Sequence, residues 1–281
     1  MGDIMAGLAL SLTSTARRHY QASPAWRLVH PRRFHAFCVG AGKSGTHSIA
    51  GMLEGGYRTA HEPETDSLID VILAEREGRM SPAEVAGWLR QRDRRLWLEM
   101  DSSGLNGAVV GHLAALYPEA RFVLTIRDCY SWLDSLLNHH ATRPTTDSWR
   151  RLRDARFPPE ERIYAPGEEV LRQYGLFPVG AYLKHWAAHN QAVLKAVPAE
   201  RLLVIRTDRI AECAPRLAAF LDVPLDTLDV DRAHMFRRRA DAGLIARVDP
   251  ALIERRAAEH CRRIMGIYFP DIPDMASAGI A

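Results

Sequence analysis

The stretch that decides the fold is FHAFCVGAGKSGTHSIAGML, Phe34 to Leu53. It starts with an apolar run of strand length, passes through a glycine-rich turn and continues as a helical pattern from Thr46. A strand, turn and helix in this order direct several backbone N–H groups and the positive end of a helix dipole toward one point. The segment therefore predicts an anion-binding loop at the edge of a parallel sheet.

Strand-like and helix-like stretches alternate along the rest of the chain. Further apolar runs of strand length are YRTA, LWLEM, RFVLTI and RLLVIR. Helical patterns lie between them and begin at about Thr65, Ser81, Leu105, Tyr130 and Ala181; the second opens with a capping box, Ser81 to Glu84. This order predicts an α/β fold in which a P-loop-type parallel sheet is flanked by helices on both faces. We expect one domain over residues 1–281, with an N-terminal extension at 1–30 and an irregular or helical insertion over the sheet at 141–180.

Composition limits the partners of such a domain. The chain carries 37 basic and 34 acidic side chains, so its net charge of +3 does not suggest a surface that coats nucleic acid. Its four cysteines form no metal-ligand pattern, and we expect no metal site and a reducing, cytoplasmic compartment. The N-terminal apolar run IMAGLALSL is too short to cross a bilayer, so no transmembrane segment is expected.

Only Lys43, Lys184 and Lys195 are lysines, and a lysine inside the loop indicates a need for a compact ammonium group.

The loop differs from the Walker A loop of nucleoside triphosphatases. That motif has a glycine five residues before its Gly-Lys pair, where this chain has Phe37. Lys43 to Thr46, Lys-Ser-Gly-Thr before a helix, instead resembles the 5′-phosphosulfate loop of sulfotransferases. The donor of that family is 3′-phosphoadenosine 5′-phosphosulfate (PAPS), and its product is 3′-phosphoadenosine 5′-phosphate (PAP). The resemblance implies that the donor is bound by Gly42, Lys43, Ser44, Gly45, Thr46, His47 and Ser48.

A second pattern supports this resemblance. In RFVLTIRDCYSWLDSLLNHH, Arg127 ends a strand and Ser135 follows eight residues later on the next helix. Sulfotransferases place an arginine and a serine with this spacing against the 3′-phosphate of the donor. A guanidinium and a hydroxyl at such positions can converge on one phosphate, with charge-assisted hydrogen bonds of roughly 1.5 to 3 kcal/mol each.

The resemblance to sulfotransferases extends from about Phe34 to Phe269. It implies that Arg237 or Arg238, in the basic loop MFRRRADAG, closes over the 3′-phosphate. The chain departs from the family pattern at Thr207, where a glutamate is usual.

A catalytic base is needed opposite Lys43, because an acceptor loses a proton when it receives a sulfuryl group. The residues HEPE, His61 to Glu64, follow the strand-like run YRTA and so lie at the carboxyl edge of the sheet, where ligands of doubly wound folds bind. Glu62 is the predicted base, because many sulfotransferases of carbohydrate and tyrosine type use a glutamate in this place. His61 and Glu64 are the alternatives.

Other polar and aromatic residues have two interpretations each. His139 and His140 lie either near the cleft or at an exposed helix end. Aromatic residues of the insertion, among them Phe157 and Tyr174, either shape an acceptor pocket or form a small core.

The sequence thus predicts a sulfotransferase that moves a sulfuryl group in line, without a metal, from PAPS to a hydroxyl or amine. The acceptor would be a small molecule, a carbohydrate or a natural product, met on the side of the 141–180 insertion. An ATP- and magnesium-dependent small-molecule kinase is the alternative, because Asp101 resembles a Walker B aspartate. A non-enzymatic binder of an anionic polymer is a third possibility and would need a one-sided basic face. The sequence leaves the oligomeric state open.

Overall fold

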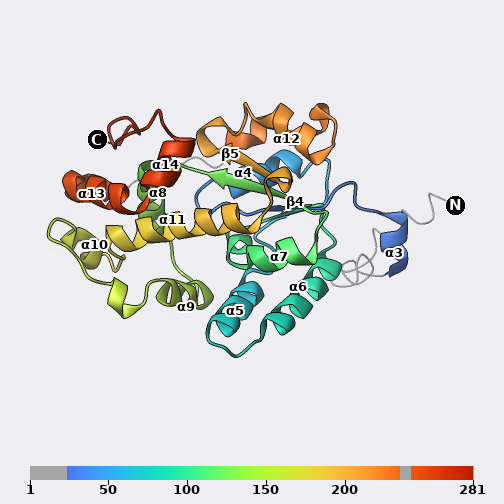
Figure 1. The fold of residues 1–281 in the computed structure, drawn as a ribbon, viewed down its shortest axis with the longest axis horizontal. Coiled ribbons are helices and arrows are strands. Elements are labelled where there is room, and N and C mark those ends of the chain that lie inside the picture. The colour runs from blue at the N-terminus through green and yellow to red at the C-terminus, as the bar shows by residue number, and fades with distance from the viewer. Residues whose placement is uncertain (1–23, 235–241, 281) are drawn as a thin grey trace.

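Five strands form one parallel sheet. The computed structural model describes residues 24–234 and 242–280, and Figure 1 shows the fold. The strands lie in the order β2-β3-β1-β4-β5. Their bounds are Ala36–Cys38 (β1), Thr59–His61 (β2), Met100–Ser102 (β3), Arg121–Ile126 (β4) and Leu202–Arg206 (β5). The predicted α/β fold with a parallel sheet is confirmed.

Helices cover both faces of the sheet. On one face lie α4 (Thr46–Leu53) and α12 (Ala214–Leu221), and on the other lie α5 (Thr65–Arg76), α6 (Pro82–Leu96) and α7 (Val110–Leu116). Figure 1 shows α12 above the strands and α5, α6 and α7 below them. Successive residues of a strand point to opposite faces. In β1, Ala36 and Cys38 therefore pack with the first group of helices, and Phe37 packs with the second.

The third strand begins later than the sequence predicted. In LWLEM, Leu96 is the last residue of α6 and Trp97 has a left-handed backbone with φ 49°, so only the last residue of the run belongs to β3. The indole of Trp97 packs against Arg32, whose guanidinium lies 4.3 Å from the ring centroid. At its other end α6 starts from the predicted capping box, in which Ser81 N donates to Glu84 Oε2 over 2.8 Å.

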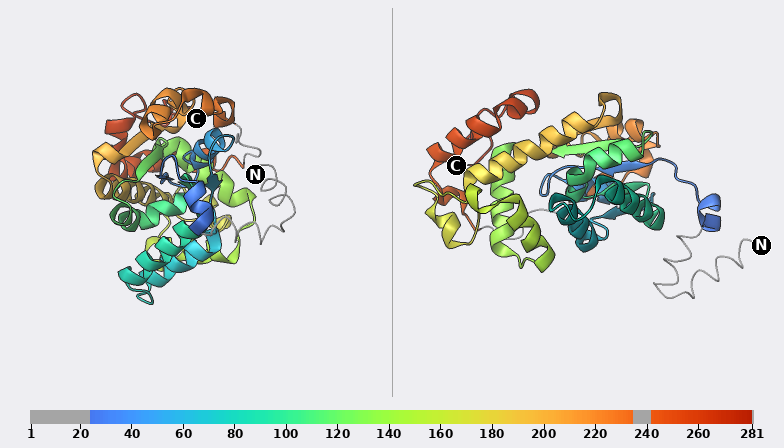
Figure 2. Two further views of the ribbon diagram at one scale, coloured as in Figure 1. Left: turned by 90° about the vertical axis from the view of Figure 1, so that its right-hand side faces the viewer. Right: turned by 60° about the horizontal axis from the view of Figure 1, so that its bottom comes forward.

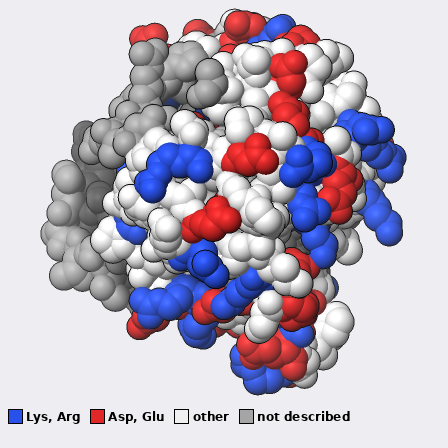
Figure 3. Space-filling model, turned by 90° about the vertical axis from the view of Figure 1, so that its left-hand side faces the viewer, with Lys and Arg blue, Asp and Glu red and all other residues white. Residues whose placement is uncertain are grey.

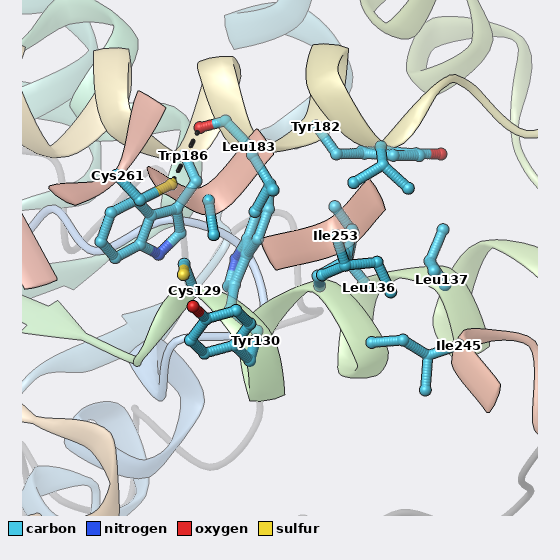
Figure 4. Packing of buried hydrophobic residues seen from close by; sticks show 14 of the residues in the cluster. Cys129, Tyr130, Leu136, Leu137, Tyr182, Leu183, Trp186, Ile245, Ile253 and Cys261 are labelled. Carbon is cyan, nitrogen blue, oxygen red and sulfur yellow. Dashed lines mark hydrogen bonds between the residues drawn. The ribbon is translucent and has the colours of Figure 1, made fainter. Parts of the chain in front are cut away.

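The 141–180 segment is mostly helical and shares an apolar cluster with the C-terminal helices. The helices that contribute to this cluster are α8 (Cys129–Thr142), α10 (Glu169–Gln173), α11 (Val179–Ala196), α13 (Pro250–His260) and α14 (Arg262–Tyr268). Helix α9 (Asp147–Arg156) ends just before Phe157, and its own Leu152 packs in the cluster of α5 and α6. Figure 4 shows Tyr182 and Trp186 of α11 packed in it beside Ile253 and Cys261. Phe157 is 2% exposed in the same cluster, whereas Tyr174 is 49% exposed. Phe157 therefore belongs to a core.

The molecule is elongated, with helix α3 (Pro24–Val29) at one end of its long axis and α13 toward the other (Figures 1 and 2). The N-terminal run IMAGLALSL and the basic loop with Arg237 and Arg238 lie outside the described residues. Within residues 24–234 and 242–280, no helix combines the length and the apolar character needed to cross a membrane. On the face shown in Figure 3, basic and acidic side chains interleave, so this face is not one-sidedly basic.

Candidate active site

The loops after β1 and β4 lie where the strand order of the sheet reverses. From β1 the chain crosses to β2 at one edge, whereas β4 leads to β5 at the other edge. β1 and β4 are neighbours and pair Cys38 with Val123. Ligands of doubly wound sheets bind outside the carboxyl ends of the strands at such a switch point. The loop with Lys43 and the turn with Arg127 both start there.

Two left-handed residues shape the loop after β1. Lys43 has φ 70° and Gly45 has φ 105°. A side chain at Gly45 would collide with Ile210, because its Cβ would lie 2.5 Å from Cδ1. Gly40 is confined as well, since a Cβ there would lie 2.0 Å from Thr125 Oγ1. Left-handed residues in a tight loop turn successive N–H groups toward a common centre, which makes an anion-binding nest.

Donor groups behind the loop hold its carbonyl oxygens. Trp132 Nε1 donates to Gly42 O over 2.9 Å, and Thr207 Oγ1 donates to Ser44 O. The hydroxyl of Ser44, which is 2% exposed, donates to Ala41 O over 2.6 Å. Ser44 N also donates to Ala41 O over 3.1 Å, so an anion would be met by N–H groups of the other loop residues. Trp132 and Thr207 were missed as site residues, although Thr207 stood out as a departure from the family pattern.

The first turn of α4 contacts the end of β2. Thr46 Oγ1 lies 3.1 Å from His61 Nε2, and the rings of His47 and His61 stack with centroids 4.3 Å apart. Burial, with a smaller contribution from the charge of His47, lowers the pKa of His61 to about 4. Burial also lowers the pKa of His47. His61 is therefore neutral near pH 7, and it joins the loop to the segment with the candidate base.

Glu62 is a strained residue with a buried carboxyl group. Its φ is 51°, a left-handed conformation that typically costs a residue with a side chain about 1 to 3 kcal/mol. The strain is held by two hydrogen bonds: Glu62 N donates to Ser102 O over 2.9 Å, and Thr65 Oγ1 donates to Glu62 O over 2.6 Å. Burial raises the pKa of Glu62, and the positive charge of Arg156 opposes that rise. Such strain tends to occur at functional sites, where surrounding contacts hold it in place.

The alternative base Glu64 is already engaged. Arg95 donates to both of its carboxylate oxygens, over 2.8 and 2.7 Å. The hydrogen bond from Arg95 lowers the pKa of Glu64. By contrast, the carboxylate of Glu62 makes no hydrogen bond or ion pair with any described residue. Among the two carboxylates, Glu62 is the one placed to accept a proton from a ligand.

Arg127 lies at the carboxyl end of β4, as its sequence position predicted. Its Nε donates to Ser131 Oγ over 2.9 Å, and Ser131 in turn donates to the N-capping carboxylate of Asp128. Ser135 follows Ser131 by one helical turn and therefore lies on the same face of α8. Ser131 was missed from the sequence, although its place three residues after the capping Asp128 was a usable signal. The helical register thus puts both hydroxyls on one face of α8, and the guanidinium of Arg127 contacts the first of them.

Asp101 is part of a buried ion pair. Its Oδ2 accepts a hydrogen bond from Arg92, and its Oδ1 accepts one from Asn106 over 3.1 Å. Asp101 and Arg92 are 5% and 3% exposed. A Walker B aspartate directs its carboxylate toward a magnesium ion, whereas this carboxylate is neutralised by a guanidinium. Asp101 therefore resembles a Walker B aspartate in its sequence position but not in the contacts of its carboxylate.

A family model and several solved structures resemble this chain. The family model described as a sulfotransferase domain matches residues 35–234. No curated protein matches the chain. Among solved structures, sulfotransferase STF9 from Mycobacterium avium has a TM-score of 0.50 at 14% identity, over 90% of this chain and 82% of that chain. At 14% identity, this likeness shows a similarity of fold.

Two other structures are similar at lower scores. A sulfotransferase from Alicyclobacillus acidocaldarius has a TM-score of 0.48 at 17% identity, covering 87% of this chain and 98% of its own. The sulfotransferase domain from the Synechococcus PCC 7002 olefin synthase has a TM-score of 0.40 at 13% identity, covering 88% and 92%. Because the family model spans more than half of the residues and includes the loop at Lys43, the strand-end Arg127 and Glu62, the chain belongs to the sulfotransferase family.

Proposed function

We propose that the protein transfers a sulfuryl group from PAPS to a hydroxyl or amine of a small-molecule, carbohydrate or natural-product acceptor. The observation that carries the proposal is the loop at the switch point, in which Lys43 and Gly45 are left-handed and the carbonyl oxygens are held from behind. Such a loop offers N–H groups to one anion, and Lys43 adds a compact positive charge. The family assignment makes a phosphosulfate the best candidate for that anion.

The described residues fit such a donor. PAPS would supply the sulfuryl group and a 5′-phosphate that leaves with increased negative charge. Lys43, which is exposed, and the N–H groups of the loop would stabilise that charge. Arg127 and Ser135 would bind the 3′-phosphate, and the hydrogen bond from Arg127 to Ser131 already orients the guanidinium.

Glu62 is the proposed general base. Its carboxylate is half-buried, is not neutralised by a hydrogen-bonded partner in the described structure, and has a pKa raised by burial. A carboxylate with a raised pKa is a stronger proton acceptor than one exposed to water, and it is still ionised at neutral pH when the rise is small. Positioning and electrostatics then account for the transfer.

The choice of donor is tested by a thermal-shift comparison. PAP without metal should raise the melting temperature of the protein, because a ligand that binds only the folded state stabilises it. ATP with magnesium should raise it less. Lys43→Ala should remove most of the response to PAP, whereas Lys195→Ala, which removes an exposed lysine at the end of α11, should leave it unchanged. A larger response to ATP with magnesium would replace this proposal with the kinase alternative.

The role of Glu62 is tested separately from donor binding. Glu62→Gln preserves the size of the side chain and removes its capacity to accept a proton. It should bind PAP with nearly the affinity of the unmodified protein and should transfer sulfate at least about a hundredfold more slowly, within the usual contribution of a general base. Nearly unchanged turnover would assign the base to another residue, such as His61.

A further inference from the structure

Helix α9 bridges two parts of the protein at the acceptor side. Leu152 is 2% exposed in the apolar cluster that contains α5 and α6, and Arg151 pairs with Asp70 of α5 over 2.7 Å. Directly after α9, the ring of Phe157 packs edge-on against Tyr182 of α11, with centroids 5.2 Å apart. Figure 1 shows α9 beside α5 and below α11. The middle of α9 and the residue that follows it are thus fixed by contacts.

Among the described residues, two arginines of this helix form no salt bridge, although the negative charge of Glu62 acts on one of them, Arg156. Arg150 pairs with Asp147 over 2.8 Å at the exposed surface of α9. Arg153 and Arg156, in contrast, make no hydrogen bond or ion pair with any residue in the ranges 24–234 and 242–280. The Nε atom of Arg153 is buried without a hydrogen-bond partner. Both side chains remain partly exposed, so a ligand can reach them.

The surroundings of this pair connect it to the candidate site. Arg153 and Arg156 are three residues apart on α9 and therefore share a face. The charge of Arg156 acts on Glu62, and both arginines help to lower the pKa of His140, which burial brings to about 2. Lys43 also contributes to the low pKa of His140. Arg156 therefore lies within electrostatic reach of the candidate base, and both arginines lie within reach of His140, on which Lys43 of the loop also acts.

The charge of Glu62 does not fully compensate the burial of this arginine pair. Burial and the neighbouring charge of Arg153 lower the pKa of Arg156 to about 10, which still leaves it charged at neutral pH. His139 and His140, in the last turn of α8, are neutral near pH 7 because their pKa values are about 4 and about 2. Two partly buried like charges repel each other and have lost hydration. An anion between them would offset both costs through charge-assisted hydrogen bonds.

We propose that the acceptor carries an oxyanion, a carboxylate, phosphate or sulfate group, which Arg153 and Arg156 bind. This inference rests on the proposed function, since it assigns the acceptor of the same site. Anchored there, the acceptor would present its hydroxyl or amine to Glu62. The class of acceptor is then a molecule with a reactive hydroxyl or amine and a separate acidic group.

The test uses the full chain saturated with PAP and inorganic or simple anions as probes. Sodium acetate, phosphate and sulfate are titrated at constant ionic strength, with chloride as the balancing ion, and the melting temperature is recorded. Three proteins are compared: the unmodified chain, Arg153→Met/Arg156→Met, and Arg150→Met/Arg151→Met as a control of equal charge change on the same helix. The single variants Arg153→Met and Arg156→Met serve if the double variant does not fold.

We expect at least one of the three anions to stabilise the unmodified protein and the control, and its apparent affinity to be about tenfold or more weaker in Arg153→Met/Arg156→Met. The preferred anion identifies the acidic group of the acceptor. Equal responses in all three proteins, or no response to any anion, would overturn the inference. If the unmodified protein does not bind PAP, the proposed function itself is overturned. The two failures are therefore distinguishable.

Discussion

Replacement of Gly45 by alanine tests whether the backbone of the loop creates the anion site. At φ 105° a residue with a side chain costs roughly 1 to 2 kcal/mol, and the new Cβ would lie 2.5 Å from Ile210 Cδ1, an overpacking worth about 1 to 3 kcal/mol. The free energy of unfolding should fall by about 2 to 5 kcal/mol. For a chain of this size the melting temperature should fall by roughly 4 to 20 °C.

The assay combines thermal unfolding with calorimetric titration of PAP. Relief of the strain would rotate loop N–H groups away from their common centre, so Gly45→Ala should bind PAP at least about tenfold more weakly, the equivalent of one charge-assisted hydrogen bond. Gly78→Ala is the matched control, because Gly78 is also left-handed, φ 71°, but a Cβ there meets nothing within 4 Å. The control should lose some stability and keep PAP affinity. Unchanged PAP affinity in Gly45→Ala would refute the reasoning about the loop.

Three further predictions concern contacts around the site. Arg156→Met should shift the acid limb of the pH profile of kcat/KM to higher pH. The lost positive charge raises the pKa of Glu62 further, and only ionised Glu62 can accept a proton. Arg156→Lys keeps the charge and should shift the profile little. Arg92→Met should cost about 3 to 5 kcal/mol in urea unfolding, since it leaves Asp101 buried without its partner, and a loss below 1 kcal/mol would contradict the buried pair. Thr207→Val should lower stability by about 1 to 3 kcal/mol and weaken PAP binding, because the carbonyl oxygens of Ser44 and Ile126 lose the one hydroxyl donor that they share; unchanged PAP affinity would count against its support of the loop.

Local features of the chain were predictable from the sequence. The strand, glycine turn and helix at Phe34 to Leu53 are specified by neighbouring residues, so β1, the loop and α4 follow from pattern alone. The positions of Lys43, Glu62 and Arg127 at the carboxyl edge follow from the parallel sheet, which places every strand end on one side.

Support from distant residues could not be predicted in the same way. The donors that hold the loop carbonyls, Trp132 and Thr207, lie 90 and 163 residues along the chain from the groups they bind. Nothing local distinguishes Arg153 and Arg156 from Arg150, because an arginine on a polar helix is usually solvated and its pairing depends on the helices packed against it. The strand run LWLEM was placed too early because Trp97 packs with Arg32, a contact that periodicity does not encode.

The most direct test of the account is transfer of labelled sulfate from PAPS. The protein is incubated in EDTA with PAPS carrying radioactive sulfur and a panel of acceptors that have a hydroxyl or amine together with an acidic group, and PAP and labelled product are quantified. The account predicts equal amounts of PAP and labelled product from the unmodified protein, and formation of both at least about a hundredfold slower in Lys43→Ala and Glu62→Gln. Binding and consumption of ATP with magnesium, with no binding of PAP, would contradict it.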